Sequence, residues 1–149
     1  MPGGAIAVAS DHAGFDLKEI LKRDLQGAGH DVLDLGTNSS QSVDYPDYGK
    51  ALADAVAAGQ ARLGVLVCGT GIGIAMAANR NPGVRAAVVH DVTSARLSRQ
   101  HNDANVVAFG QRLIVSETAR EALKVFLSTE FEGGRHAGRV AKLSKGCSP

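Results

Sequence analysis

The chain has 149 residues, of which 44% are hydrophobic, and a formal net charge of +1 from 16 basic and 15 acidic side chains. This length and composition suit one compact domain with a buried core and leave no room for a separate substrate domain. The near balance of charge and the absence of a long apolar run exclude a general attraction to nucleic acid and a membrane span. We therefore expect one domain over residues 1–149, with a C-terminal tail from about residue 143, and neither a nucleic-acid nor a membrane partner.

Neither a signal peptide nor a disulfide framework is predicted. Met1 to Gly4 lead directly into a short strand rather than into a hydrophobic leader. The 2 cysteines, Cys68 and Cys147, are too few for a disulfide framework or a zinc ligand set. We therefore expect a cytoplasmic protein.

Short apolar runs alternate with amphipathic segments along the chain. The apolar runs predict strands at 5–9, 31–35, 65–68, 86–89 and 106–109. Helical spacing predicts helices at 17–28, 44–58, 75–79, 91–101 and from 116 onward. In the first helix Lys18 and Lys22 are assigned to the solvent face, and Asp44 with Pro46 is expected to cap the second. The alternation predicts an α/β fold: a single-domain, five-stranded parallel sheet with helices on both faces, in a Rossmann-like or flavodoxin-like three-layer sandwich.

Residues 65–75 carry the most informative local pattern. A β-branched run ends at Cys68, glycines occupy positions 69, 71 and 73, and a helix-forming segment begins at Ala75. Such glycines let the backbone approach a ligand closely, so that successive N–H groups converge on an anion beside a helix N-terminus. The alternative is a buried cysteine and a loop that only makes the turn. The dinucleotide-binding pattern G-x-G-x-x-G does not fit, because Ile74 occupies the position of its third glycine. The Walker phosphate-binding pattern does not fit either, because no Lys-Ser/Thr pair follows the loop.

Other polar segments follow the strands or end the helices. Ligands bind at the carboxyl ends of parallel strands, where Asp11-His12, residues 68–73 and His90-Asp91 should gather. As alternatives, Asp11 serves only as a helix cap, and residues 101–103 are an ordinary helix end in which Asn favours left-handed geometry.

Arg135 and Arg139 are four residues apart and would share one face of a helical turn, next to His136. Two planar guanidinium groups with a nearby histidine suit a phosphate dianion. The alternative is a pair of solvated surface charges.

Five segments, in the same order, resemble the type B ribose-5-phosphate isomerases, within the wider family that acts on allose and galactose 6-phosphates. The segments are residues 10–14, 44–46, 68–73, 98–105 and 132–136. The resemblance extends to about Lys142, and the segment from Ser144 to Pro149 matches no motif of that family.

The resemblance implies that Cys68 is the proton acceptor and that His101 is the acid/base that opens the sugar ring. The implied substrate contacts are Asp11, His12, Gly69, Thr70, Gly71, Ile72, Gly73, Asn102, Arg112, Arg135 and Arg139, with Tyr45 and His136 as further candidates. Some members of that family lack the cysteine and carry a glutamate base at the position that corresponds to Ile74. Because this chain has Cys68 and an isoleucine there, it resembles the members that use a cysteine base. The resemblance also implies a homodimer with shared active sites, or a tetramer, and leaves open which subunit supplies Arg112.

The chemistry of aldose-ketose isomerisation suits these residue types. A proton moves between C1 and C2 through an enediolate, which requires a base, a stabiliser for the oxyanion and a way to open the ring. Cys68, the N–H groups of the glycine loop and His101 supply these, and Thr70 relays a proton between the substrate oxygens. Amides polarise the carbonyl, so no metal or other cofactor is expected. We expect a ribose 5-phosphate isomerase; the alternatives are a hexose-6-phosphate isomerase and a non-enzymatic flavodoxin-like module that binds phosphate or a nucleotide.

Overall fold

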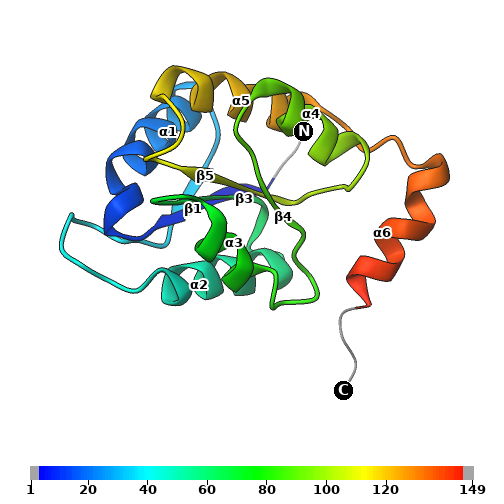
Figure 1. Cartoon of the computed structure of the whole chain (residues 1–149), viewed down its shortest axis with the longest axis horizontal. Helices are drawn as coiled ribbons and strands as arrows, with labels where there is room; N and C mark the ends of the chain where they lie inside the picture. The colour runs from blue at the N-terminus through cyan, green and yellow to red at the C-terminus, as the bar shows by residue number, and fades with distance from the viewer. Residues whose placement is uncertain (1–3, 146–149) are drawn as a thin grey trace.

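The computed structural model describes residues 4–145, which form a parallel sheet between two layers of helices (Figure 1). The strand order is β2-β1-β3-β5-β4, and each neighbouring pair is parallel. The strands are β1 (Ala5–Ser10), β2 (Val32–Asp34), β3 (Ala61–Cys68), β4 (Ala86–Val88) and β5 (Val106–Gly110). The predicted five-stranded α/β fold is thus confirmed.

Helices cover both faces of the sheet, with α1, α4 and α5 on one face and α2 and α3 on the other (Figure 1). The α-helices are α1 (Phe15–Gly27), α2 (Tyr45–Ala57), α3 (Ile72–Ala78), α4 (Val92–Gln100), α5 (Ser116–Ser128) and α6 (Ala137–Ser144). Two short 3-10 helices, η1 (His12–Gly14) and η2 (Gly134–His136), precede α1 and α6. None of the helices between residues 4 and 145 has the length and apolar character needed to cross a membrane.

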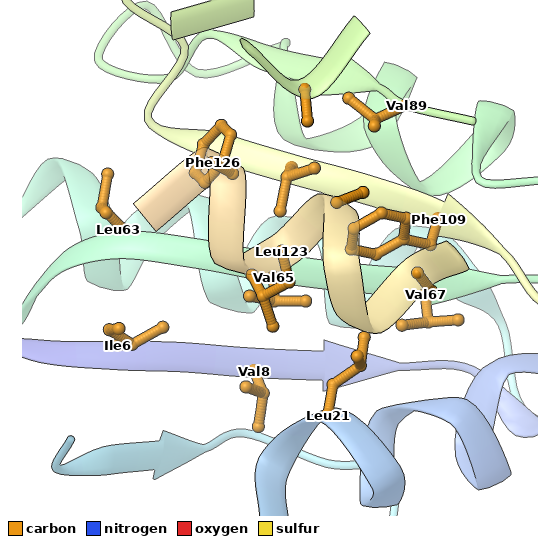
Figure 2. Close-up of a cluster of buried hydrophobic side chains, with 14 of the residues drawn as sticks. Ile6, Val8, Leu21, Leu63, Val65, Val67, Val89, Phe109, Leu123 and Phe126 are labelled. Carbon is orange, nitrogen blue, oxygen red and sulfur yellow. The ribbon is translucent and has the colours of Figure 1, made fainter. Parts of the chain in front are cut away.

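Two cores lie on opposite faces of the sheet, because neighbouring strand residues point to opposite sides. Figure 2 shows the first, in which valines and Phe109 of the central strands meet Leu21 of α1 and Leu123 and Phe126 of α5. In the second, Leu66 and Cys68 lie with Leu52 of α2 and Ile74 of α3. Burying each large apolar side chain contributes roughly 1.5–3 kcal/mol. The cores therefore hold the ends of the strands, and the loops that follow them, in fixed positions.

The starts of three helices test the predicted boundaries and caps. Helix α3 begins at Ile72 instead of Ala75, because Gly71 has a left-handed conformation (φ 78°) that turns the chain directly into the helix. Asp44 occupies the N-cap position of α2, but its side chain makes no capping hydrogen bond, so that part of the prediction is wrong. Asp91 does cap α4, where it exchanges hydrogen bonds with Ser94. The glycine loop is consequently shorter than expected, over residues 69–71.

The segment after α4 is held by two arginines. Asp103, rather than Asn102, takes the left-handed conformation (φ 47°). Its carboxylate accepts a hydrogen bond from Arg99 Nη1 at 3.0 Å and lies 3.5 Å from Arg85 Nη2. Its backbone carbonyl accepts a further bond from Arg85 Nε at 2.8 Å. These contacts fix the turn that carries His101.

The C-terminal helix lies apart from the three-layer body (Figure 1). It is tied back through Arg85, whose Nη1 donates to Ser144 Oγ at 3.1 Å. Helix α6 continues to Ser144, past the expected start of the tail at about residue 143. Cys147 lies outside the described residues.

Candidate active site

The strand order reverses between β1 and β3, which is where ligands bind in open parallel sheets. Asp11 follows β1, and its backbone N–H donates to Val67 of β3 at 3.3 Å. Asp11 and His12 therefore lie beside the glycine loop, as predicted. His90 and Asp91 follow β4 at the sheet edge, beyond β5, so the sheet order places them further from this group.

Cys68 ends β3 with its thiol directed at the loop that follows. Its Sγ accepts a hydrogen bond from the backbone N–H of Gly71 at 3.1 Å, and the residue is only 4% exposed. Thr70 is exposed, and its Oγ1 accepts from the N–H of Ile72 at 3.2 Å. The thiol therefore lies at the edge of the loop, as predicted, with one N–H donor on its sulfur. The convergence of several loop N–H groups on a bound anion stays a prediction.

The glycine loop rests directly on the end of β5. A Cβ at Gly110 would lie 2.5 Å from the carbonyl oxygen of Thr70, and one at Gly71 would lie 2.9 Å from the carbonyl carbon of Phe109. The N–H of Gln111 also donates to the Cys68 carbonyl at 2.9 Å. The two backbones are therefore in contact, which keeps the loop N–H groups in place.

Arg112, Tyr45 and His12 surround the same loop. A Cβ built at Gly69 would lie 3.0 Å from Arg112 Nη1, so this guanidinium group lies against the loop of its own chain. One built at Gly73 would lie 2.6 Å from Tyr45 Cε1. His12 Nδ1 lies 3.1 Å from the backbone nitrogen and 3.2 Å from the carbonyl oxygen of Val43, so the loop after β2 holds its ring in place. Asp11, His12, Tyr45, Cys68 and Arg112 thus form one group.

His101 and Asn102 lie at the opposite end of β5. Cys68 pairs with Gly110 at the carboxyl end of that strand, whereas Gly64 pairs with Val106 at its amino end. Helix α4 returns to the amino end, and Asn105 there accepts a hydrogen bond from Gly64 N–H. The four steps along β5 correspond to roughly 13 Å. The structure therefore does not bring His101 and Cys68 of one chain together.

A second group forms around His101. Its ring stacks on that of His136, with centroids 4.4 Å apart and an interplanar angle of 16°. Glu132 is brought alongside by its N–H, which donates to the Gln100 carbonyl at 3.1 Å. Arg135 and Arg139 follow on η2 and α6 and are exposed. Burial, and then the positive charge of His101 and Arg135, lower the pKa of His136, while Glu132 opposes the shift.

Sequence reasoning missed an ion pair beneath the first group. Lys18, expected on the solvent face, is fully buried and donates to Asp34 Oδ1 at 2.9 Å and to the Thr37 carbonyl at 2.7 Å. Paired charges can be buried, and the long side chain reaches under the loop that follows β2. Burial raises the pKa of Asp34, but hydrogen bonds from Lys18 and Lys22 outweigh it, and the net shift is downward. Thr37 N–H in turn donates to Ser10, next to Asp11, at 2.9 Å.

Comparisons with known proteins show the family of the chain. The model of the Ribose/Galactose Isomerase family matches residues 6–143. The chain is 47% identical over 139 residues to the ribose-5-phosphate isomerase B of Escherichia coli, covering 93% of both chains. It is 44% identical over 140 residues to a putative sugar phosphate isomerase of Bacillus subtilis, covering 93% of this chain and 94% of that one.

Solved structures agree in fold. A ribose 5-phosphate isomerase from Thermotoga maritima superposes with a TM-score of 0.93 at 48% identity, covering 95% of this chain and 98% of the other. The ribose-5-phosphate isomerase B of Mycoplasma genitalium with bound ribulose-5-phosphate gives a TM-score of 0.91 at 40% identity, covering 96% and 95%. The resemblance predicted from five short segments is confirmed, and the chain belongs to the ribose/galactose isomerase family.

Proposed function

We propose that the protein interconverts ribose 5-phosphate and ribulose 5-phosphate through an enediolate. The observation that carries this proposal is the Cys68 thiol at the edge of the glycine loop, where the backbone N–H of Gly71 donates to its sulfur. As a thiolate, Cys68 takes the proton from C2 of the open-chain aldose and returns it to C1. The loop N–H groups stabilise the negative oxygen of the enediolate, and Thr70 relays a proton from O2 to O1.

His101 opens the sugar ring before the proton transfer. It accepts the proton of the anomeric O1 hydroxyl as the bond between C1 and the ring oxygen breaks, and a proton passes to that ring oxygen. An imidazole has one nitrogen that can accept a proton and one that can donate a proton, which suits both steps. Stacking against His136 restrains its ring plane.

The two groups meet across a homodimer in this proposal. Cys68 and His101 lie at opposite ends of β5 within one chain. One chain alone therefore cannot bring both the base and the ring-opening histidine to the same substrate. Asp11, His12, Cys68 and Arg112 come from one subunit, and the group around His101 comes from the other. Apolar side chains near the glycine loop are exposed, with Ile72 at 45% and Met76 at 66%. Such exposure is typical of a surface that a partner covers.

Arg135 and Arg139 bind the phosphate of the substrate in this arrangement. Both are exposed and follow the turn that carries His136. Planar guanidinium groups bind a phosphate dianion with paired hydrogen bonds, which anchors the end of the sugar remote from the reacting carbons. Asn102 contacts the sugar hydroxyls beside His101.

An assay on three sugars tests the proposal. Purified protein is supplied with ribose 5-phosphate, allose 6-phosphate or galactose 6-phosphate, and the ketose product is measured. We expect turnover of ribose 5-phosphate to be the fastest. Faster turnover of either hexose phosphate would show instead that the protein is a hexose-6-phosphate isomerase. A protein inactive on all three sugars that bound a nucleotide would instead be a non-enzymatic module, which has no use for the thiol or for His101.

A further inference from the structure

Three side chains of the group around His101 are of types that bind transition metals. Nitrogens of His101 and His136 and a carboxylate oxygen of Glu132 all lie within 4.8 Å of one another. They come from two separate segments, the end of α4 and the turn that leads into α6. Two imidazoles and one carboxylate form a ligand set that zinc sites in proteins use.

His136 has an unused ligand atom at the centre of this cluster. The residue is only 7% exposed, and its Nε2 has no hydrogen-bond partner among the described residues. The nearest carboxylate oxygen, Glu132 Oε1, is 3.7 Å away, which is too long for a hydrogen bond. Buried polar atoms normally have partners. A bound cation would give this nitrogen one.

The charges around the cluster bear on which ion it can hold. Arg135 and Arg139 are exposed beside it and repel cations, so a hard ion held by charge alone, such as Mg²⁺, is disfavoured. Imidazole ligands select ions such as Zn²⁺.

The stacked rings require only a local adjustment to bind an ion. With an interplanar angle of 16°, the two rings are stacked face to face, so the in-plane lone pairs of their nitrogens cannot both point at one ion between them. Zinc binds imidazole nitrogen at about 2.0–2.1 Å, so both rings must tilt toward the ion. The torsion about the Cβ–Cγ bond of histidine is soft, and the half-exposed Glu132 leaves a path for entry.

We infer that His101, Glu132 and His136 form a binding site for a divalent transition-metal ion such as Zn²⁺, and that occupancy inhibits the enzyme. The inhibition rests on the proposed function, because the ion takes the lone pair that His101 needs to accept the O1 proton. Glu132 does not contact the substrate in that mechanism, so it contributes to metal binding alone.

Equilibrium dialysis against Zn²⁺ at pH 7 tests binding without any use of activity. We expect one zinc ion per wild-type chain. Loss of even an outer partner of a metal site costs about tenfold or more in affinity, so Glu132→Gln and His136→Asn should each weaken binding at least that much. Glu130→Gln, an equivalent change at an exposed position two residues away, is the matched control and should bind as the wild type does. Mg²⁺ should not compete.

Activity measurements then test inhibition. Zn²⁺ should inhibit the wild type and Glu130→Gln, a chelator should restore activity, and Glu132→Gln should need at least tenfold more Zn²⁺ for the same inhibition. A wild-type chain that binds no zinc overturns the inference, as does unchanged binding in both Glu132→Gln and His136→Asn. Zinc that those variants retain and Cys68→Ser loses would be bound to the thiol instead. If the protein had no isomerase activity, the dialysis experiment would still test zinc binding, because it does not depend on activity.

Discussion

The sulfur of Cys68 lies 3.1 Å from the backbone nitrogen of Gly71, which donates a hydrogen bond to it. The donor belongs to a three-residue loop that rests on the backbone of β5. The sulfur and its donor are therefore held in place by the sheet rather than by a flexible side chain. This fixed geometry makes the effects of substitution at Cys68 predictable.

Cys68→Ser should retain the fold and lose most activity. Serine is similar in size and can accept the same hydrogen bond, but a hydroxyl is a far weaker base at neutral pH. Loss of general-base assistance typically lowers turnover by about a hundredfold or more. Steady-state kinetics with ribose 5-phosphate and circular dichroism check the two halves of this prediction. Near-normal turnover would exclude Cys68 as the base.

Arg139→Ala should raise KM for ribose 5-phosphate by about ten- to a hundredfold, since a hydrogen bond to a charged group contributes roughly 1.5–3 kcal/mol. The slow use of unphosphorylated ribose should hardly change, because that substrate has no phosphate to bind. Arg23→Ala, at an exposed position on α1, is the control and should leave both values unchanged. Equal losses on both substrates would indicate damage to the fold rather than loss of a phosphate contact.

Mixed dimers test whether the active sites are shared. Cys68→Ala and His101→Ala chains, each inactive alone, are refolded together. In a mixed dimer with C2 symmetry one site carries both defects and the other carries neither. Random pairing makes about half of the dimers mixed, so activity should recover to about a quarter of the wild-type value. If both residues acted within one chain, mixing would restore nothing even though subunit exchange had been confirmed.

Substitutions at Asp103 should separate backbone strain from ion pairing. Asp103→Ala and Asp103→Gly both remove the carboxylate that Arg85 and Arg99 contact. Only alanine retains a Cβ in the left-handed conformation, which costs roughly 1–2 kcal/mol. In urea unfolding, alanine should therefore be less stable than glycine by about that amount. Equal stabilities would show that the turn relaxes when the carboxylate is lost.

The buried ion pair should make stability depend on pH in the acid range. The folded-state pKa of Asp34 lies below its ordinary value of 3.8, so its contribution to stability is complete above that value and is lost as the pH falls through the folded pKa. Asp34→Asn should flatten the dependence of unfolding free energy on pH below about 4. Lys18→Met, which leaves Asp34 without one of its partners, should destabilise the protein by about 3 kcal/mol at pH 7. If the unfolding free energy of Asp34→Asn fell with acid as steeply as that of the wild type, Asp34 would not be the source of this pH dependence.

The fold was predictable because its signals are local. Continuous apolar runs at residues 5–9 and 65–68 identify central strands whose two faces are both buried, and parallel pairing then brings Asp11 beside Cys68. The start of α3 was mispredicted because Gly73 is a poor helix former, and the turn at Gly71 depends on close packing against β5.

Other features depend on contacts between distant segments. Lys18 carries the pattern of a surface residue, and only Asp34 and Thr37, from the next strand and loop, make its burial possible. The stack of His101 on His136 joins residues that no local periodicity relates. The separation of His101 from Cys68 follows from the path of α4, which returns the chain to the amino end of β5, whereas Cys68 pairs at its carboxyl end.

The contact between Gly110 and the backbone of Thr70 limits how this scaffold can acquire a new substrate range. Any side chain added at Gly110 or Gly71 would overlap main-chain atoms, so neither position can evolve to fit a longer or shorter sugar. Changes in substrate range must instead come from exposed residues around the site, such as Tyr45 and Asn102, whose side chains can change in size. Libraries aimed at new specificity should leave the two glycines unchanged and diversify those exposed positions.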